Sequence, residues 1–219
     1  MDSSSASFSL LQLFSMGGVF MWPLLVFSIA TIAITIERAI YLLYHNLRLG
    51  DLKEKVEEAI KNGNIAETKE YLSKQTRRRI GARILLALVN YSSHSEHRLE
   101  KAVEAEAMSC IASLENGFNF LTALGSLSPL TGFLGTVSGM IGAFRSIAEA
   151  VDVNAQIVAN GIYEALITTV FGLIIAIIAM SAHSIFANTV DKFASDVEIV
   201  CSELIIDIGE SHSAEKNAG

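Results

Sequence analysis

The sequence is poor in cysteine and in charge, and these scarcities exclude several classes of protein. Its two cysteines, Cys110 and Cys201, lie far apart and without metal-ligand spacing, so we expect neither a disulfide framework nor a zinc site. Charged residues make up 18% of the chain, too few for an ordinary soluble domain. The net charge of -7 disfavours a nucleic-acid partner, because phosphate binding requires a positive surface. No local motif combines a nucleophile, a base and an orienting acid, so we predict neither an enzyme nor a cofactor.

What the sequence has is apolar length. Of its 219 residues 51% are hydrophobic, and the mean hydropathy is +0.44. The runs over residues 19–36, 118–144 and 160–186 can each cross a bilayer as a helix. We therefore predict an all-α integral membrane protein with three transmembrane helices, long helices that extend into the cytoplasm and a small cytoplasmic helical domain.

The expected domain boundaries follow the change from continuous hydrophobicity to helical periodicity. The basic-rich region lies between the first and second spans and is therefore expected to be cytoplasmic, with the N-terminus on the other side. Residues 1–9 lack a basic start, so we expect no cleavable signal peptide. The segments are an N-terminal outer or interfacial segment (1–18, with a short helix over 10–16), the first transmembrane helix (19–45), the cytoplasmic domain (46–117), the second transmembrane helix (118–144), an outer loop (145–160), the third transmembrane helix (161–187) and a cytoplasmic C-terminal helix and tail (188–219).

The cytoplasmic domain is predicted to consist of short amphipathic helices. Asn62, Gly63 and Asn64 interrupt the periodicity, so one helix should end and another begin there. The apolar positions are Leu52, Val56, Ala59 and Ile60 before the break, and Ile65, Tyr71 and Leu72 after it. The run from Arg77 to Arg79 permits contact with nucleic acid or lipid headgroups, but we favour a solvated helix start close to the membrane.

Apolar residues also connect this domain to the spans. One set recurs at helical spacing without a breaker and predicts a single long helix entering the second span: Leu99, Val103, Cys110, Leu114, Phe118 and Leu121. A second set follows the third span: Val190, Phe193, Val197, Val200, Cys201, Leu204 and Ile208. We expect this C-terminal stripe to pack on the cytoplasmic domain or on a neighbouring subunit, and residues 211–219 to be disordered.

The second span is rich in glycine and hydroxyl side chains. Gly135 and Gly139 form a small-xxx-small pair that permits close helix approach, and Gly132 and Gly142 extend the same stripe. A polar seam is the second possibility, with hydroxyls at Ser128, Thr131, Thr136 and Ser138. The segment GFLGTVSG has the composition of a phosphate-binding loop, but it lacks the Gly-Lys-Ser/Thr ending and the flanking strand.

The third span carries one carboxylate, Glu164. An ionisable group in a membrane marks an ion path, or it lies at the interface near a helix N-terminus, and the span alone leaves both open. Thr168 is predicted to share a face with Glu164, while Thr169 points more than a quarter-turn away. Both faces are expected to meet protein rather than lipid.

Three stretches resemble the MotA/TolQ/ExbB proton channel family, most closely its ExbB/TolQ branch. They are GGVFMWPLLVFSIATIAITIER at residues 17–38, SPLTGFLGTVSGMIGAF at residues 128–144 and GIYEALITTVFGLIIAIIA at residues 161–179. The sequence departs from the family pattern at Ile178, where the family has a proline, and at His183 and Ser184, which replace an aromatic-asparagine pair.

The resemblance implies that Thr136 and Thr169 line a pore, that Glu164 is the pore-region glutamate and that Pro129 lies near the cytoplasmic end of the second span. It implies a ring, typically a pentamer, in the bacterial inner membrane with a periplasmic N-terminus. The ring would surround an ExbD/TolR-type single-span protein that carries a transmembrane aspartate, and a TonB/TolA-like energy transducer would use the proton flow for transport across the outer membrane. A TolQ-like role in envelope maintenance and a motility stator are alternatives, and a non-conducting membrane scaffold is a hypothesis of another class.

Overall fold

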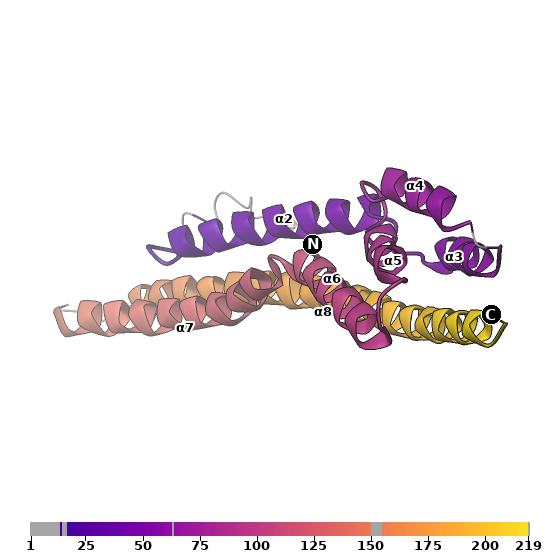
Figure 1. Ribbon diagram of the computed structural model, residues 1–219. Helices are drawn as coiled ribbons and strands as arrows, with labels where there is room; N and C mark the ends of the chain where they lie inside the picture. Colours follow the sequence, from indigo (N-terminus) through magenta and orange to yellow (C-terminus); the bar gives the residue numbers. More distant parts are fainter. Residues whose placement is uncertain (1–13, 15–16, 63, 150–154, 219) are drawn as a thin grey trace, which may run out of the picture. The chain divides into compact units, whose positions relative to one another are not determined.

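The computed structural model describes residue 14 and residues 17–62, 64–149 and 155–218. Within these ranges the secondary structure is helical, which confirms the all-α prediction (Figure 1). The short helix expected over residues 10–16 lies, apart from residue 14, outside the described residues. Three stretches are long and apolar enough to cross a membrane: Met21–Tyr44, a stretch within Glu96–Glu149, and a stretch within Gly161–Ser211.

The chain divides into two compact units. The first consists of Met1–Ile36 and Gly117–Ser184, and the second of Glu37–Asn116 and Ile185–Gly219. In the first unit, α2 (Met21–Tyr44) packs against α8 (Ala155–Ala218) through an apolar cluster. The cluster contains Met21, Leu24, Ile167 and Ile175, flanked by Phe27 and Phe171. Burial of this face explains the four-residue spacing of large apolar side chains in α8.

The second unit is built from α3 (Gly50–Asn62), α4 (Ile65–Gln75), α5 (Ile80–Tyr91), α6 (Glu96–Glu115) and the last part of α8. The apolar stripe predicted for α3 is buried, except that Ile60 is half-buried. Helix α3 ends at Asn62 and α4 begins at Ile65, as the break in periodicity predicts; Gly63 lies outside the described residues. The centre of the second unit consists of side chains with essentially no exposure: Leu52, Val56, Leu72, Ile84, Leu85 and Leu88.

The single long helix predicted to enter the second span is wrong. The six apolar positions at residues 99–121 are all buried, but α6 ends at Glu115 and α7 (Phe118–Glu149) begins after a turn. Gly117 has a φ of 88°, a left-handed conformation that glycine adopts without steric cost. The amide of Leu121 then donates to the Gly117 carbonyl at 3.3 Å and starts the next helix. Periodicity located the buried face and missed the turn.

Helix α8 is longer than the sequence suggested. It begins at Ala155, while α7 continues to Glu149, so the connection between them is shorter than the expected loop over residues 145–160. An ion pair of 2.9 Å between Arg145 and Glu149 supports the last turn of α7. The tail expected to be disordered is helical through Ala218, and α8 also passes through Ile178 without interruption, since no proline stands there.

The C-terminal part of α8 packs within the second unit. Its predicted apolar stripe is buried apart from the half-buried Val200. The Lys53 ammonium donates to the Glu203 carboxylate at 2.5 Å and so connects α3 to α8. Of the two surfaces expected for this stripe, the structure therefore uses the chain's own helical domain.

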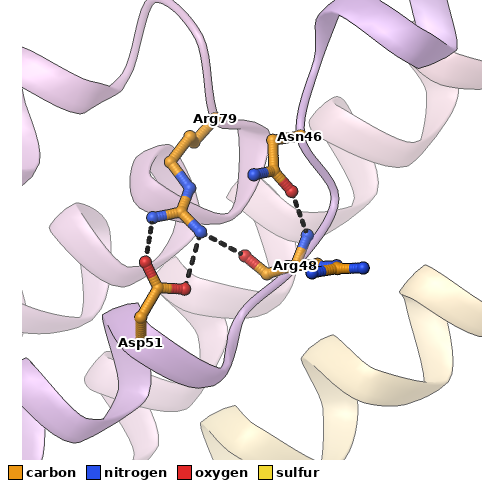
Figure 2. Close-up of polar contacts among 4 residues, drawn as sticks. All are labelled: Asn46, Arg48, Asp51 and Arg79. Atoms are coloured by element: carbon orange, nitrogen blue, oxygen red, sulfur yellow. Dashed lines mark hydrogen bonds and ion pairs between the residues drawn. The ribbon is translucent and has the colours of Figure 1, made fainter.

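The consecutive arginines after α4 do not share one environment. Arg79 is buried, and its guanidinium donates to both carboxylate oxygens of Asp51 and to the Arg48 carbonyl, the latter at 3.0 Å (Figure 2). Arg77 and Arg78 are exposed. One arginine therefore anchors the segment between α2 and α3, and the other two face solvent.

We expect Asp51→Asn to weaken this anchor, because the buried Arg79 guanidinium loses its charged acceptor. Local opening of residues 46–51 should become easier by about 1–2 kcal/mol, measured by amide hydrogen exchange of the full chain in detergent. Arg79 also holds the pKa of Asp51 below its ordinary value of 3.8. The stabilisation is therefore complete above that value and is lost as the pH falls through the lowered pKa.

The control is Glu54→Gln, which removes an exposed carboxylate from the same helix and should leave the exchange rates unchanged. Equal protection of residues 46–51 in Asp51→Asn and Glu54→Gln would contradict the anchoring role.

Candidate functional site

Helices α7 and α8 run antiparallel and approach closely within the first unit. A Cβ atom on Gly139 would lie 3.1 Å from the Gly161 carbonyl oxygen, and one on Gly132 would lie 2.8 Å from that of Thr168. As residue number rises along α7, the opposing residue number falls along α8. The contact is thus one of backbone against backbone, which small residues permit.

Further glycines extend this contact. A Cβ on Gly172 would lie 2.5 Å from the Ser128 carbonyl oxygen, and one on Gly135 would collide with the Thr168 side chain. By contrast, a Cβ on Gly142 would meet no atom within 4 Å. The glycine face that contacts α8 therefore includes residues 132, 135 and 139 and stops before Gly142.

Two adjacent hydroxyls of α8 converge on one carbonyl of α7. The hydroxyls of Thr168 and Thr169 donate to the Gly132 carbonyl oxygen at 3.2 Å and 3.1 Å. A carbonyl can only accept, so the direction of both bonds is fixed. Thr168 has one hydroxyl proton, which it shares between the Gly132 carbonyl and the nearer carbonyl of Ala165 in its own helix, at 2.8 Å. The absence of a side chain at Gly132 is what lets both hydroxyls reach its backbone.

The threonines differ in exposure. Thr168 is 1% exposed, so nothing outside the chain can reach its hydroxyl. Thr169 and Thr136 are half-exposed, and Thr136 donates to the Phe133 carbonyl at 2.6 Å. The hydroxyl protons of Thr136 and Thr169 are thus engaged by carbonyls, while both oxygens retain lone pairs that can accept a hydrogen bond.

Two further hydroxyls of α7, those of Ser128 and Thr131, bond within that helix. Ser128 donates to the Leu124 carbonyl at 2.6 Å, and Thr131 donates to that of Leu127 at 2.9 Å. Ser138 is exposed. Pro129 lies inside α7 and has no N–H to donate to the carbonyl four residues before it. Serine and threonine that bond to their own helix can lie on an apolar surface at little cost.

Glu164 lies in α8 one turn before Thr168, as the sequence placed it, while its side chain lies outside what the structure describes. Within the described residues, no group of three His, Cys, Asp or Glu side chains is arranged to hold a metal ion.

Sequence reasoning found the glycines of α7 and predicted that the α8 face of Thr169, with Gly172, Ala176 and Ala179, meets protein. It did not identify Gly161 or the contact of Gly172 with the Ser128 backbone. The signal was present as small residues that recur at intervals of three, four and seven at positions 161, 165, 172, 176 and 179, of which all but the half-buried Gly161 are buried. Thr168 was placed on the Glu164 face, but its bond across to α7 was not anticipated.

Comparison with known proteins places this arrangement in a family. A model described as the MotA/TolQ/ExbB proton channel family matches residues 67–199. Over 210 residues, 89% of the chain, it is 33% identical to the putative biopolymer transport protein ExbB-like 1 of Synechocystis, of which 80% is covered. It is 30% identical over 162 residues to the biopolymer transport protein ExbB of Pseudomonas putida, covering 71% of this chain and 45% of the relative.

A further relative is the Tol-Pal system protein TolQ of Haemophilus influenzae, 42% identical over 86 residues, which is 39% of this chain and 38% of that protein. The chain thus covers most of the Synechocystis relative and less than half of the other two. With three stretches that can span a membrane, it is a multi-pass membrane protein of a proton-channel class. It belongs to the MotA/TolQ/ExbB proton channel family, in the ExbB/TolQ branch.

We expect Gly132→Ala to destabilise the α7–α8 pair, because the new Cβ would press on the backbone of α8, which cannot rotate away. The free energy of unfolding should fall by about 1–3 kcal/mol. Thermal unfolding of the full chain in detergent, followed by circular dichroism, measures the change. Gly142→Ala is the matched control, since its Cβ enters open space and should not lower the melting temperature. Equal melting temperatures for the two variants would refute the close contact.

Proposed function

We propose that this protein is the ring-forming subunit of an inner-membrane motor driven by the proton-motive force. Several copies, by resemblance five, would surround the transmembrane helices of an ExbD/TolR-type partner that carries a membrane aspartate. Proton flow through the complex would be coupled by a TonB-like transducer to transport across the outer membrane. The names of the relatives, which are biopolymer transport proteins, support this role.

The observation that carries the proposal is the pair of half-exposed threonines, Thr136 on α7 and Thr169 on α8. Each hydroxyl proton is held by a backbone carbonyl, so each half-exposed oxygen keeps lone pairs that can accept a hydrogen bond. A protonated carboxyl group has a hydrogen to donate, whereas a carboxylate can only accept. Within a membrane, where water does not compete, such an oxygen favours the protonated form of a carboxyl group that approaches it.

Thr169 can also serve the ionised form. Its hydroxyl can rotate from the Gly132 carbonyl to a carboxylate, while Thr168 still donates to that carbonyl at 3.2 Å. The site therefore has two settings, one for each protonation state of the partner's aspartate. Thr168, whose proton is shared between the Gly132 and Ala165 carbonyls, remains beside the Gly132 carbonyl in both settings, and Glu164 would assist proton exchange at the end of the path.

The free energy needed to change the hydrogen bond of one threonine is within the energy that one proton supplies. A membrane potential of about 100 mV supplies roughly 2.3 kcal/mol per proton. Exchange of one interhelical hydrogen bond in a membrane is worth about 0.6 kcal/mol on average. The proton's energy therefore exceeds the cost of resetting one threonine, and the remainder is available to move the partner helices.

The surface of the first unit supports assembly. Large apolar side chains of α7 and α8 are exposed in the single chain: Leu127, Leu130, Phe133, Leu134, Met140, Ile141, Phe144, Leu166, Leu173, Ile174 and Ile177. Lipid or neighbouring subunits would cover them. Thr136 lies on this exposed side of α7, where a ring would bring it to the inner wall or to a subunit contact.

We assign the spans to residues 19–45, 118–144 and 161–187, with residues 46–117 and 188–219 in the cytoplasm. The basic-rich second unit then lies inside, as the distribution of Lys and Arg requires, and residues 1–18 and the connection after α7 face the periplasm. A TolQ-like role in envelope maintenance has specific support from the 42% identity to TolQ, and it would use the same site with a TolA-like transducer. A motility stator and a non-conducting scaffold are the remaining alternatives.

Proton uptake into vesicles tests the function. With the single-span partner co-reconstituted, we expect Thr169→Val to reduce flux at least about tenfold, because loss of the outward oxygen costs the protonated carboxyl about one hydrogen bond, on the order of 1.4 kcal/mol. Glu164→Gln and Thr136→Val should reduce it as well. Flux should be absent without the partner.

Thr189→Val is the matched control: it removes a hydroxyl of α8 that bonds to its own helix, to the Ile185 carbonyl at 2.9 Å. Flux that survives Thr169→Val and Thr136→Val would move the path elsewhere. No flux from the wild-type complex under any partner combination, with assembly intact, would favour the scaffold.

A further inference from the structure

We propose that the exposed side chains of Arg48, Arg77 and Arg78 form a docking surface for the phosphate headgroups of anionic phospholipids. This proposal requires that α2 cross the membrane, and it is independent of proton flow. The surface is named the arginine patch below.

Backbone contacts beyond the end of α2 bring the segment that contains Arg48 beside Arg78, and Arg77 directly precedes Arg78 in the chain. The backbone amide of Asn46 donates to the Arg78 carbonyl at 3.2 Å, and the Arg79 guanidinium donates to the Arg48 carbonyl at 3.0 Å. The segment that follows α2 therefore lies directly beside the turn before α5. Residues far apart in sequence contribute to one patch, and the Asp51–Arg79 pair holds them there.

The end of α2 also defines the depth of this patch. Trp22 is 64% exposed at one end of the helix and Tyr44 is 59% exposed at the other. Aromatic side chains of this kind prefer the two membrane interfaces. The 22 helical steps from Trp22 to Tyr44 rise about 33 Å, close to the thickness of the hydrocarbon core. Arg48 follows Tyr44 by four residues, so the arginine patch lies at the level of the headgroups.

The patch has uncompensated charge. Arg79 is held by the Asp51 carboxylate, whereas Arg48, Arg77 and Arg78 are exposed and have no carboxylate partner in the ranges that the structure describes. Figure 2 shows the Arg48 side chain pointing away from the Asp51–Arg79 pair. The chain as a whole has a net charge of -7, so three unpaired guanidinium groups make the local charge of this patch differ in sign from that of the chain.

The position selects the ligand. A guanidinium group presents two parallel N–H donors that match the oxygens of a phosphate. Soluble polyanions would also fit this chemistry, but a membrane surface is always present at this depth and holds its phosphates at high local concentration. Each arginine near an anionic surface strengthens binding about fivefold. Residues 77–79 were expected to form a solvated helix start. Under the present proposal Arg77 and Arg78 contact lipid headgroups instead.

Spin-labelled lipids test the proposal with the full chain reconstituted in phosphatidylcholine vesicles. The fraction of motionally restricted label should be several-fold higher for phosphatidylglycerol than for phosphatidylcholine. In R77Q/R78Q most of this preference should be lost, and Arg48→Gln should lower it separately. The matched control is K69Q/R98Q, which removes the same charge from exposed positions elsewhere in the second unit and should retain the preference.

Circular dichroism and size-exclusion profiles identify a variant that has lost its fold. If R77Q/R78Q has lost its fold, the lipid preference of Arg48→Gln alone tests the proposal. No headgroup preference in the wild type, or the same preference in wild type and R77Q/R78Q, would overturn the proposal. Loss of the preference in the presence of millimolar glycerol phosphate or of RNA would instead assign the patch to a soluble phosphate or to a nucleic acid.

Discussion

The Gly132 carbonyl of α7 is the point on which the first unit depends. Two hydroxyls from the opposing helix reach it only because no side chain stands at residue 132, and the antiparallel contact on either side holds the helices at that distance. Close packing replaces the hydrophobic driving force that two helices lack in lipid, so glycine and threonine do here what leucine does in a soluble core. The same contact that stabilises the pair also orients the half-exposed oxygen of Thr169.

The second unit is organised by different physics. Its helices bury leucine, isoleucine and valine as a soluble bundle does, and a single buried guanidinium, that of Arg79, fixes the segment leaving α2. Within one run of three arginines, Arg79 thus has a structural role, whereas Arg77 and Arg78 are exposed. Each unit is thus stabilised by its own kind of packing, which agrees with the division of the chain into two compact units.

Sequence patterns predicted the helical class, the three apolar stretches and most buried faces, because hydrophobic periodicity reports burial directly. They failed at Gly117, where the helical spacing of the apolar residues on both sides outweighed the turn signal of the Asn116-Gly117 pair, and at residues 211–218, where polarity suggested disorder in a helix that continues. Thr168 and Thr169 were assigned to different faces, correctly by angle, yet one carbonyl accepts from both. Such convergence depends on the distance between two helices, which no single helix encodes.

The two adjacent threonines also bear on speed. Rotation of a hydroxyl takes picoseconds to nanoseconds, whereas displacement of packed helices takes microseconds to milliseconds. If Thr169 changes its acceptor while Thr168 holds the carbonyl, the local step reaches equilibrium many times during one helix movement. The hydrogen bond of Thr169 would then change rapidly with the protonation state of the carboxyl group. The turnover time of the complex would be set by the slower movement of the helices around it.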